Sequence, residues 1–126
     1  MSVNYKSIPR KNPGDSSVPE KYYAKIVNKG STDLNQLAAL LGDGSTARKA
    51  DVYAVLVGLV EEIKKELSAG RMVKLGDLGS FAVSINSFGE ETPEEVSSNS
   101  IKRRKILYRS SAELKTMLGA LKFKKI

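Results

Sequence analysis

The sequence predicts an α+β fold, with two helices followed by a β-hairpin, and three features of its hydrophobic pattern support this. Residues 34–69 carry apolar side chains at helical spacing, with one interruption at Gly42-Asp43-Gly44. After Gly70 the period changes to the alternation that is typical of β-strands. Residues 1–30 form a separate opening section with its own strand-like runs.

The opening section is predicted to be a short N-terminal β extension. A first apolar run lies near residues 3–8, and a second, residues 22–27, is rich in the aromatic and β-branched residues that favour strands. Prolines and a glycine between the two runs indicate a loop. We therefore expect one domain at residues 1–30 and a second at residues 31–126.

The most informative stretch lies in the second predicted helix. Every residue from 52 to 60 is apolar or glycine, whereas a surface helix needs only one apolar stripe. In a chain of 126 residues, such a helix needs cover from its own subunit and from something else, and a second copy is the simplest cover. A fully internal helix in a monomer is the alternative.

The second half of the chain is predicted to form a hairpin with a long excursion. Alternating runs at residues 71–75 and 81–85 flank Gly76-Asp77-Leu78-Gly79, which indicates a tight glycine turn. Residues 86–100 are rich in serine and are expected to be exposed. Residues 101–108 return as a basic strand, and a short helix with apolar residues at helical spacing follows.

The composition restricts the possible functions. Lysine and arginine number 21 against 14 acidic residues, and this net charge of +7 favours a polyanionic partner, either nucleic acid or an anionic membrane surface. The chain has no cysteine or histidine, which excludes disulfides, thiolate nucleophiles, imidazole bases and zinc sites that use these ligands. Its start lacks the apolar core of a signal peptide, and no apolar run reaches the roughly 20 residues of a membrane span. We expect a cytoplasmic protein with no cofactor, metal, membrane or small-molecule substrate.

Two segments carry a family resemblance. Residues 70–83, GRMVKLGDLGSFAV, are similar to a signature in which a glycine ends a dimer helix and a Val-x-Leu strand, a glycine turn and Gly-(Thr/Ser)-Phe follow. Residues 108–115 resemble the segment where a DNA-embracing arm returns and the last helix begins. Over residues 31–123 the chain thus resembles the histone-like proteins HU and integration host factor. The extension around residues 5–23 and the Thr-Pro-Glu-Glu stretch at 92–95 are similar to the Bacteroides-type HU-related subfamily.

The resemblance implies an HU-like intertwined homodimer with a helical base, whose two β-hairpin arms bind double-stranded DNA. Residues 31–126 would form the HU-like DNA-binding domain, with the arm at about 84–103. The implied function is that of a bacterial nucleoid-associated protein that binds and condenses DNA without sequence specificity and without enzymatic activity. The residues expected in the shared dimer core are Val55, Leu56, Leu59, Val60 and Phe81.

Basic residues at the base of the arm and on the body are the predicted DNA contacts. The densest group lies on the returning strand, where apolar residues between the cations would anchor the strand. Because neutralised phosphates release counterions, binding should weaken steeply with salt. The predicted DNA-binding residues are Lys102, Arg103, Arg104, Lys105, Arg109, Lys115, Lys122, Arg71, Lys74 and Pro93.

The predicted arm tip departs from the family pattern. HU arms carry a basic tip and a proline that wedges between base steps, but here Pro93 lies between Glu90-Glu91 and Glu94-Glu95. Carboxylates repel phosphate, so Pro93 is expected to shape the turn more than to intercalate. We expect binding through the phosphate backbone, from the base of the arm and the body, without strong kinking.

Three alternatives come from other functional classes. Residues 36–42 resemble the start of a helix-turn-helix motif, although residues 52–60 offer no polar face for a DNA groove. A scaffolding role would use the acidic tip or the extension to bind a protein. An enzyme has the least support, because Gly42-Asp43-Gly44-Ser45-Thr46 lacks the Gly-Lys-Ser/Thr ending of a phosphate-binding loop.

Overall fold

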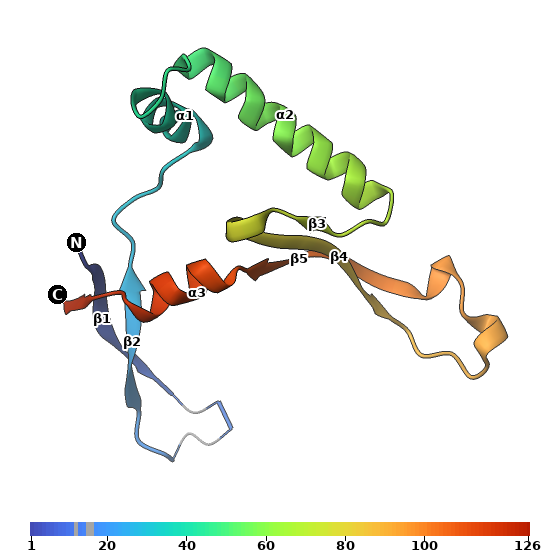
Figure 1. The fold of residues 1–126 in the computed structure, drawn as a ribbon. Helices are drawn as coiled ribbons and strands as arrows, with labels where there is room; N and C mark the ends of the chain where they lie inside the picture. The colour runs from blue at the N-terminus through green and yellow to red at the C-terminus, as the bar shows by residue number, and fades with distance from the viewer. Residues whose placement is uncertain (12, 15–16) are drawn as a thin grey trace. The chain divides into compact units, whose positions relative to one another are not determined.

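The computed structural model describes residues 1–11, 13–14 and 17–126, and these fall into two compact units (Figure 1). One unit comprises residues 34–116, and the other combines residues 1–33 with residues 117–126. The described residues form three α-helices and two three-stranded sheets. This mixed α/β arrangement confirms the predicted order of elements up to the last helix. The predicted domain boundary after residue 30 stays a prediction, because the units describe only which segments pack together.

The first two helices of the larger unit pack against each other, and Ala38 on the first of them is fully buried. Helix α1 spans Leu34–Asp43 and helix α2 spans Lys49–Ser68, as the helical spacing predicted. Helix α2 ends in a glycine cap: Gly70 has a φ of 82°, and its N–H donates to the Leu67 carbonyl. A left-handed residue at this position lets the chain satisfy the last helical carbonyls and turn into the first strand.

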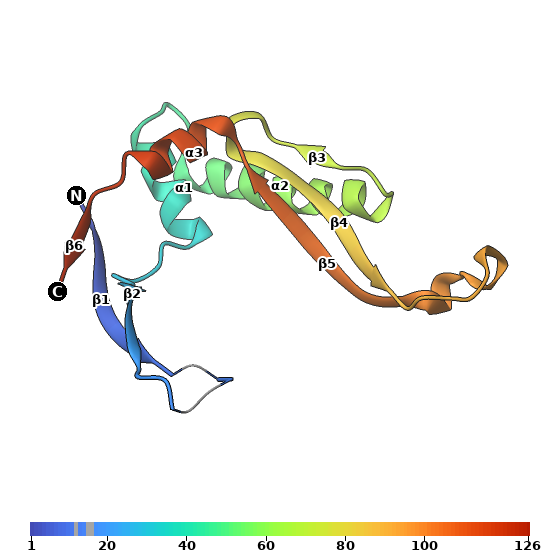
Figure 2. The same cartoon turned by 90° about the horizontal axis from the view of Figure 1, so that it is seen from below.

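The sheet of the larger unit is antiparallel, with the order β3-β4-β5. Strand β3 spans Val73–Lys74, β4 spans Gly79–Ser87 and β5 spans Ile101–Ser110. Because β3 has only two residues, β4 and β5 continue past it as a two-stranded arm (Figure 2). The predicted hairpin and returning strand are thus confirmed. Two short 3-10 turns, Pro93–Glu95 and Ser98–Ser100, shape the segment that joins β4 to β5.

The turn between β3 and β4 is held by side chains from the far end of β5. The Tyr108 hydroxyl donates to the Leu78 carbonyl at 2.6 Å. The Ser111 hydroxyl donates to the Asp77 carbonyl, and its oxygen accepts from the N–H of Leu114 at 3.1 Å. Ser111 therefore caps the first turn of helix α3, Ala112–Gly119, and also fixes that turn to the hairpin.

Gly79 is required where this turn enters β4. Its φ is 128°, a conformation that side chains other than glycine rarely adopt, and a methyl group there would overlap the carbonyl oxygen of Arg109. We expect Gly79→Ala to destabilise the fold by at least about 2 kcal/mol, seen as a lower urea midpoint. Gly89→Ala is the matched control, because its φ is not positive and its methyl group would meet open space. Equal stability of the two variants would contradict this role.

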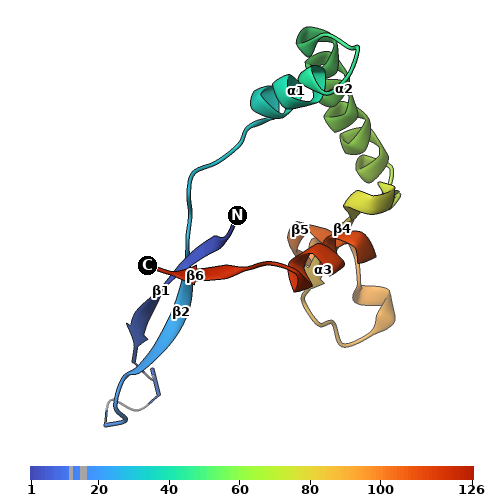
Figure 3. The ribbon, with the colours of Figure 1, turned by 60° about the vertical axis from the view of Figure 1, so that its left-hand side comes forward.

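The smaller unit is built around a second sheet with the order β2-β1-β6 (Figure 3). Strand β1, Val3–Arg10, pairs antiparallel with β2, Lys21–Val27, which confirms the predicted N-terminal β section. Strand β6, Phe123–Lys125, pairs parallel with β1. This strand was not predicted from the sequence. The C-terminal residues thus share a sheet with the N-terminal ones.

Little of the apolar surface is buried within one chain. Ala38 and Leu67 are the buried apolar residues among those the structure describes. In the middle of α2, Val55 is 71% exposed, and on α1 Leu40 is 64% exposed. The apolar surface that the sequence placed all round α2 is therefore largely open to solvent in a single chain.

Candidate nucleic-acid interface

Strands β3, β4 and β5 present two faces of opposite character, because side chains alternate along a strand and directly paired residues share a face. The register pairs Lys74 with Ser80 and Ser80 with Arg109, so these three residues form one row across the sheet. Further along the arm, Ser84 lies opposite Lys105 and is on the same face. We call this face the polar arm face; its residues are Lys74, Ser80, Ala82, Ser84, Asn86, Arg103, Lys105, Leu107 and Arg109.

The cations of the polar arm face have short, uncharged neighbours. Lys105 lies opposite Ser84 and Arg103 lies opposite Asn86. Residues two apart on a strand are about 6.8 Å apart, so Arg103 and Lys105 form a row of positive charge along the arm. Over the part of the chain that the structure describes, no ion pair involves these two side chains. Both are exposed and available to an external anion.

At the base of the arm the same face has a shallow hollow of about 310 Å³. Lys74 and Arg109 supply positive charge, and Ser80 and Ser110 supply hydroxyl groups, while the hydroxyl of Ser111 is engaged with Asp77 and Leu114. Cations and hydroxyls are the usual ligands of DNA phosphates. The two cations were predicted from the sequence, whereas the serines were not. The only feature of the sequence that could have indicated these serines is their position, because each lies beside the glycine turn or at the junction of β5 and α3.

The opposite face of the sheet is mainly apolar. Phe81 and Tyr108 lie directly across from each other, with ring centroids 5.1 Å apart. Val83 and Ile106 form the next pair on this face, and Arg104, across from Ile85, follows. The structure therefore separates Arg104 from Arg103 and Lys105, although the sequence grouped all three.

Lys102 lies at an irregularity in the arm. The register shifts between Asn86 and Ser87, so that Lys102 is an extra residue in β5 without a partner in β4. Its ammonium nitrogen lies 5.3 Å from the centroid of the Phe88 ring, a cation–π contact. This contact holds the charge of Lys102 close to the arm tip.

Arg71, a weaker candidate, is engaged within the chain. Its Nε lies 2.5 Å from Glu66 Oε2, and the two side chains are 65% and 46% exposed. The hydrogen bond and the charge of Arg71 lower the pKa of Glu66 from its ordinary value of 4.5, and Glu66 in turn raises the pKa of Arg71. Arg71 thus has a partner that would compete with a phosphate.

This ion pair predicts a pH effect on stability. A carboxyl whose folded pKa is lowered stabilises the fold above its unfolded pKa, and that stabilisation is lost as the pH falls through the folded value. We expect Arg71→Gln to lower the urea midpoint slightly at pH 6 and to match the wild type at pH values well below 4.5. A difference that does not change with pH would show that the pair is not its cause. The effect should be small because both groups are exposed.

The remaining predicted contacts lie elsewhere. Lys115 is exposed on α3, while Lys122 lies just before β6 in the smaller unit, where its carbonyl accepts from the Val3 N–H at 2.8 Å. Pro93 begins a 3-10 turn at the arm tip, where the Ser100 hydroxyl donates to the Glu90 carboxylate at 3.0 Å. The tip is therefore an ordered turn that carries exposed carboxylates.

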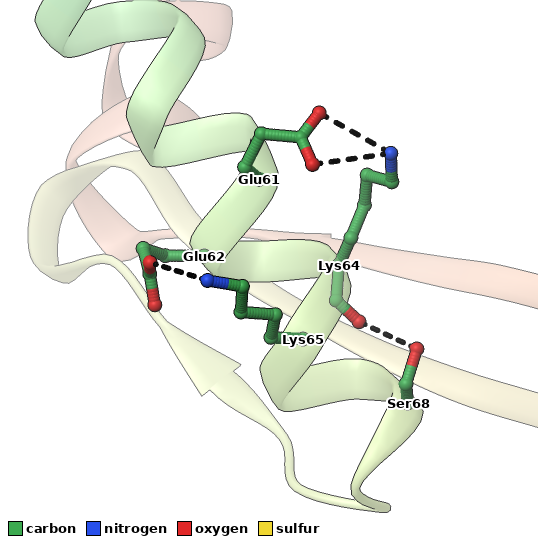
Figure 4. Close-up of polar contacts among 5 residues, drawn as sticks. All are labelled: Glu61, Glu62, Lys64, Lys65 and Ser68. Atoms are coloured by element: carbon green, nitrogen blue, oxygen red, sulfur yellow. Dashed lines mark hydrogen bonds and ion pairs between the residues drawn. The ribbon is translucent and has the colours of Figure 1, made fainter.

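The charges at the end of α2 are paired locally (Figure 4). Lys64 lies 3.2 Å from the Glu61 carboxylate, and Lys65 lies 3.2 Å from that of Glu62. All four side chains are exposed, as expected for a solvated helix face. Lys64 and Lys65 are therefore suitable control positions for tests of phosphate binding.

Comparison with known proteins identifies the family. The model of HU-HIG, described as an HU domain fused to a winged helix-turn-helix, an Ig or a glycine-rich motif, matches residues 1–125. The chain belongs to the HU-HIG family. This confirms the resemblance to HU-like DNA-binding proteins. The match includes the N-terminal sheet, so this sheet is part of the HU-HIG pattern.

Two solved structures resemble this HU-HIG chain in fold. A Bacteroides vulgatus protein, provisionally described as a bacterial DNA-binding protein, has a TM-score of 0.71 at 8% identity over 99% of this chain. The chain spans 48% of that protein's length. HU from Anabaena, in a cocrystal with DNA, has a TM-score of 0.56 at 18% identity, covering 71% of this chain and 99% of the HU chain. No curated protein matches.

Two features of the HU-HIG chain bear on other functions. No helix in the described ranges is long and apolar enough to cross a membrane. Within those same ranges, no three acidic side chains gather closely enough to hold a metal ion, and Glu90, Glu91, Glu94 and Glu95 do not form such a group.

Proposed function

We propose that this HU-HIG chain binds double-stranded DNA without sequence specificity and acts as an architectural protein of the bacterial nucleoid. The observation that carries the proposal is the polar arm face, where Arg103, Lys105 and Arg109 stand among short polar side chains with no acidic partner. Such a surface fits a line of phosphates, so binding would depend on charge and shape.

The hollow at the base of the arm supports the same proposal. Lys74 and Arg109 would neutralise a phosphate there, while the hydroxyls of Ser80 and Ser110 would donate hydrogen bonds to its oxygens. Arg104 and Arg71 are weaker contacts in this proposal, because one lies on the apolar face and the other is paired with Glu66. Lys115 and Lys122 would extend the footprint.

We infer that the working form is a homodimer. One chain leaves the middle of α2 exposed, including Val55, Leu59 and Val60, and the described residues include only two buried apolar side chains. A second copy would cover this surface and would place two arms at a fixed separation. Val55, Leu56, Leu59, Val60 and Phe81 remain the residues proposed for the shared core.

The acidic arm tip favours DNA contact through the base of the arm and not through the tip. No lysine or arginine lies between Phe81 and Lys102, and four glutamates surround Pro93. Repulsion between these carboxylates and phosphate would keep the tip from inserting into a groove. We therefore propose binding with little kinking, in contrast to arms that insert a proline between base steps.

The direct test is the salt dependence of binding to random-sequence duplexes, followed by fluorescence anisotropy. With the four cations of each polar arm face engaged, a dimer would neutralise eight phosphates, and the slope of log K against log salt should be about −7. Affinities for unrelated duplex sequences should agree within about threefold, since a specific contact would change affinity by much more. Absence of binding at low salt would refute the proposal and would favour a scaffolding role for the acidic tip.

A further inference from the structure

The net positive charge of the chain is concentrated in the smaller unit. Residues 1–33 and 117–126 contain nine lysines and arginines against three acidic residues, a net charge of +6. Residues 34–116 contain twelve against eleven, a net charge of +1. The unit that carries the arm is thus almost neutral overall, and most of the long-range attraction to a polyanion must come from the N-terminal sheet.

The strand register gathers these cations on one face. In the antiparallel pair, Lys6 lies directly opposite Lys25 and Arg10 lies directly opposite Lys21. Lys124 of β6 pairs with Asn4 and is therefore on the same face. The three strands contain no aspartate or glutamate. We call this the N-terminal basic face; its cations are Lys6, Arg10, Lys21, Lys25 and Lys124.

This arrangement opposes the stability of the sheet. Like charges directly opposite each other in an antiparallel pair are destabilising, and the N-terminal basic face has two such pairs. Over the described part of the chain, no ion pair relieves them. The Arg10 guanidinium lies 5.6 Å from the centroid of the Tyr23 ring, which holds it over this face. A bound polyanion would turn the repulsion into attraction.

The other face of the same sheet is mainly apolar, with Lys125 opposite Tyr5 as its one cation among the described residues. Tyr5, Ala24, Ile26 and Phe123 line a hollow of about 350 Å³ there. An amphipathic sheet covers its apolar face and leaves its charged face to solvent. The N-terminal basic face itself carries Ile8, Tyr23 and Val27, but the Arg10 guanidinium lies over the Tyr23 ring. Charge therefore dominates this face, which favours a phosphate backbone over an anionic membrane.

We propose that the N-terminal basic face is a second DNA-binding surface, which contacts the phosphate backbone of duplex DNA through Lys6, Arg10, Lys21 and Lys25. This inference rests on the proposed DNA binding of the chain and adds a surface distinct from the arm. Lys6 and Arg10 are four residues apart, about 13 Å along β1. DNA carries one phosphate charge for about every 1.7 Å of its axis. A duplex that lies along the roughly 13 Å between Lys6 and Arg10 therefore offers several phosphates to the N-terminal basic face.

The test compares three double variants of the full chain with the wild type. Lys6→Gln/Lys25→Gln removes two charges from the N-terminal basic face, and Lys64→Gln/Lys65→Gln removes two from the solvated end of α2. Arg103→Glu/Lys105→Glu reports on the arm. Each is titrated against a fluorescein-labelled duplex of about 40 base pairs over a series of salt concentrations, and thermal unfolding is followed by circular dichroism.

The inference predicts that Lys6→Gln/Lys25→Gln weakens binding by roughly 5- to 20-fold near 100 mM salt and makes the salt slope shallower by about two for each chain. The Lys64→Gln/Lys65→Gln control should stay within about twofold of the wild type. The unfolding temperature of Lys6→Gln/Lys25→Gln should equal or exceed that of the wild type, because a like-charge pair is removed. A loss of binding without a loss of stability is therefore the signature of a phosphate contact.

Three results would overturn the inference, and they differ in what they leave standing. If Lys6→Gln/Lys25→Gln binds like the Lys64→Gln/Lys65→Gln control while Arg103→Glu/Lys105→Glu loses affinity, the basic face is not a DNA surface and the proposed function remains. If the wild type fails to bind DNA, both fail. The same proteins are also titrated with phosphatidylserine vesicles. If Lys6→Gln/Lys25→Gln loses vesicle binding but keeps its affinity for DNA, the face binds membranes and not DNA.

Discussion

Exchange of Arg103 and Lys105 for glutamate is expected to weaken DNA binding by about 100-fold or more near 100 mM salt. Both side chains lie on the polar arm face, opposite Asn86 and Ser84. Neither pairs with an acidic side chain in the described residues, so the exchange breaks no ion pair within the chain. In a dimer the exchange removes four cations from the DNA surface and places four carboxylates beside phosphates. The salt slope should flatten in parallel, because fewer counterions are displaced.

The matched control for this exchange uses the other face of the same strand. Arg104→Glu introduces a carboxylate between the two positions, but on the apolar face across from Ile85. Its effect on DNA affinity should be much smaller than that of either Arg103→Glu or Lys105→Glu alone. Equal losses for all three would mean that net charge, and not the polar arm face, determines binding.

Replacement of Val55 by aspartate is expected to prevent assembly of the folded protein. Val55 is 71% exposed in one chain, and in a monomer a charge at this position would be nearly neutral. In the proposed dimer the carboxylate would be buried without a partner, at a cost of about 3–5 kcal/mol or more for each copy. Light scattering should show loss of the dimer, and circular dichroism should show a lower and broader unfolding transition.

Val96→Asp is the control for the Val55 experiment, since Val96 is also exposed but lies in the arm tip. It should leave the mass and the unfolding temperature unchanged. If Val55→Asp also remains folded at the same mass as the wild type, the apolar middle of α2 is not a dimer core. The homodimer, and with it the fixed spacing of two arms, would then have to be abandoned.

Much of the fold could be predicted because its signals are local. Gly70 marks the end of α2 in the sequence and takes the left-handed conformation there in the structure. The change from helical to alternating period predicted the hairpin, and the loss of alternation predicted the excursion. Strand β6 was not predicted because it has only three residues and its partner, β1, lies at the other end of the chain.

The candidate site was predicted less completely, because a run of charged residues does not by itself show which face of a strand each side chain occupies. Alternation along β5 separates Arg104 from Arg103 and Lys105, and this could have been read from the sequence once the strand was predicted. The register shift that makes Lys102 an extra residue has no sequence signal. The pairing of Arg71 with Glu66 spans the glycine cap of α2, where helical spacing no longer applies.

The central claim is that the polar arm face lies against DNA, and tethered cleavage tests it most directly. Because the chain has no cysteine, Ser84→Cys provides a single attachment site for an iron chelate on this face, opposite Lys105. Lys65→Cys provides the control on the solvated end of α2. We predict hydroxyl-radical cleavage of random duplex DNA from position 84, spread along the sequence, and little or none from position 65. Cleavage from position 65 with none from position 84 would contradict the claim.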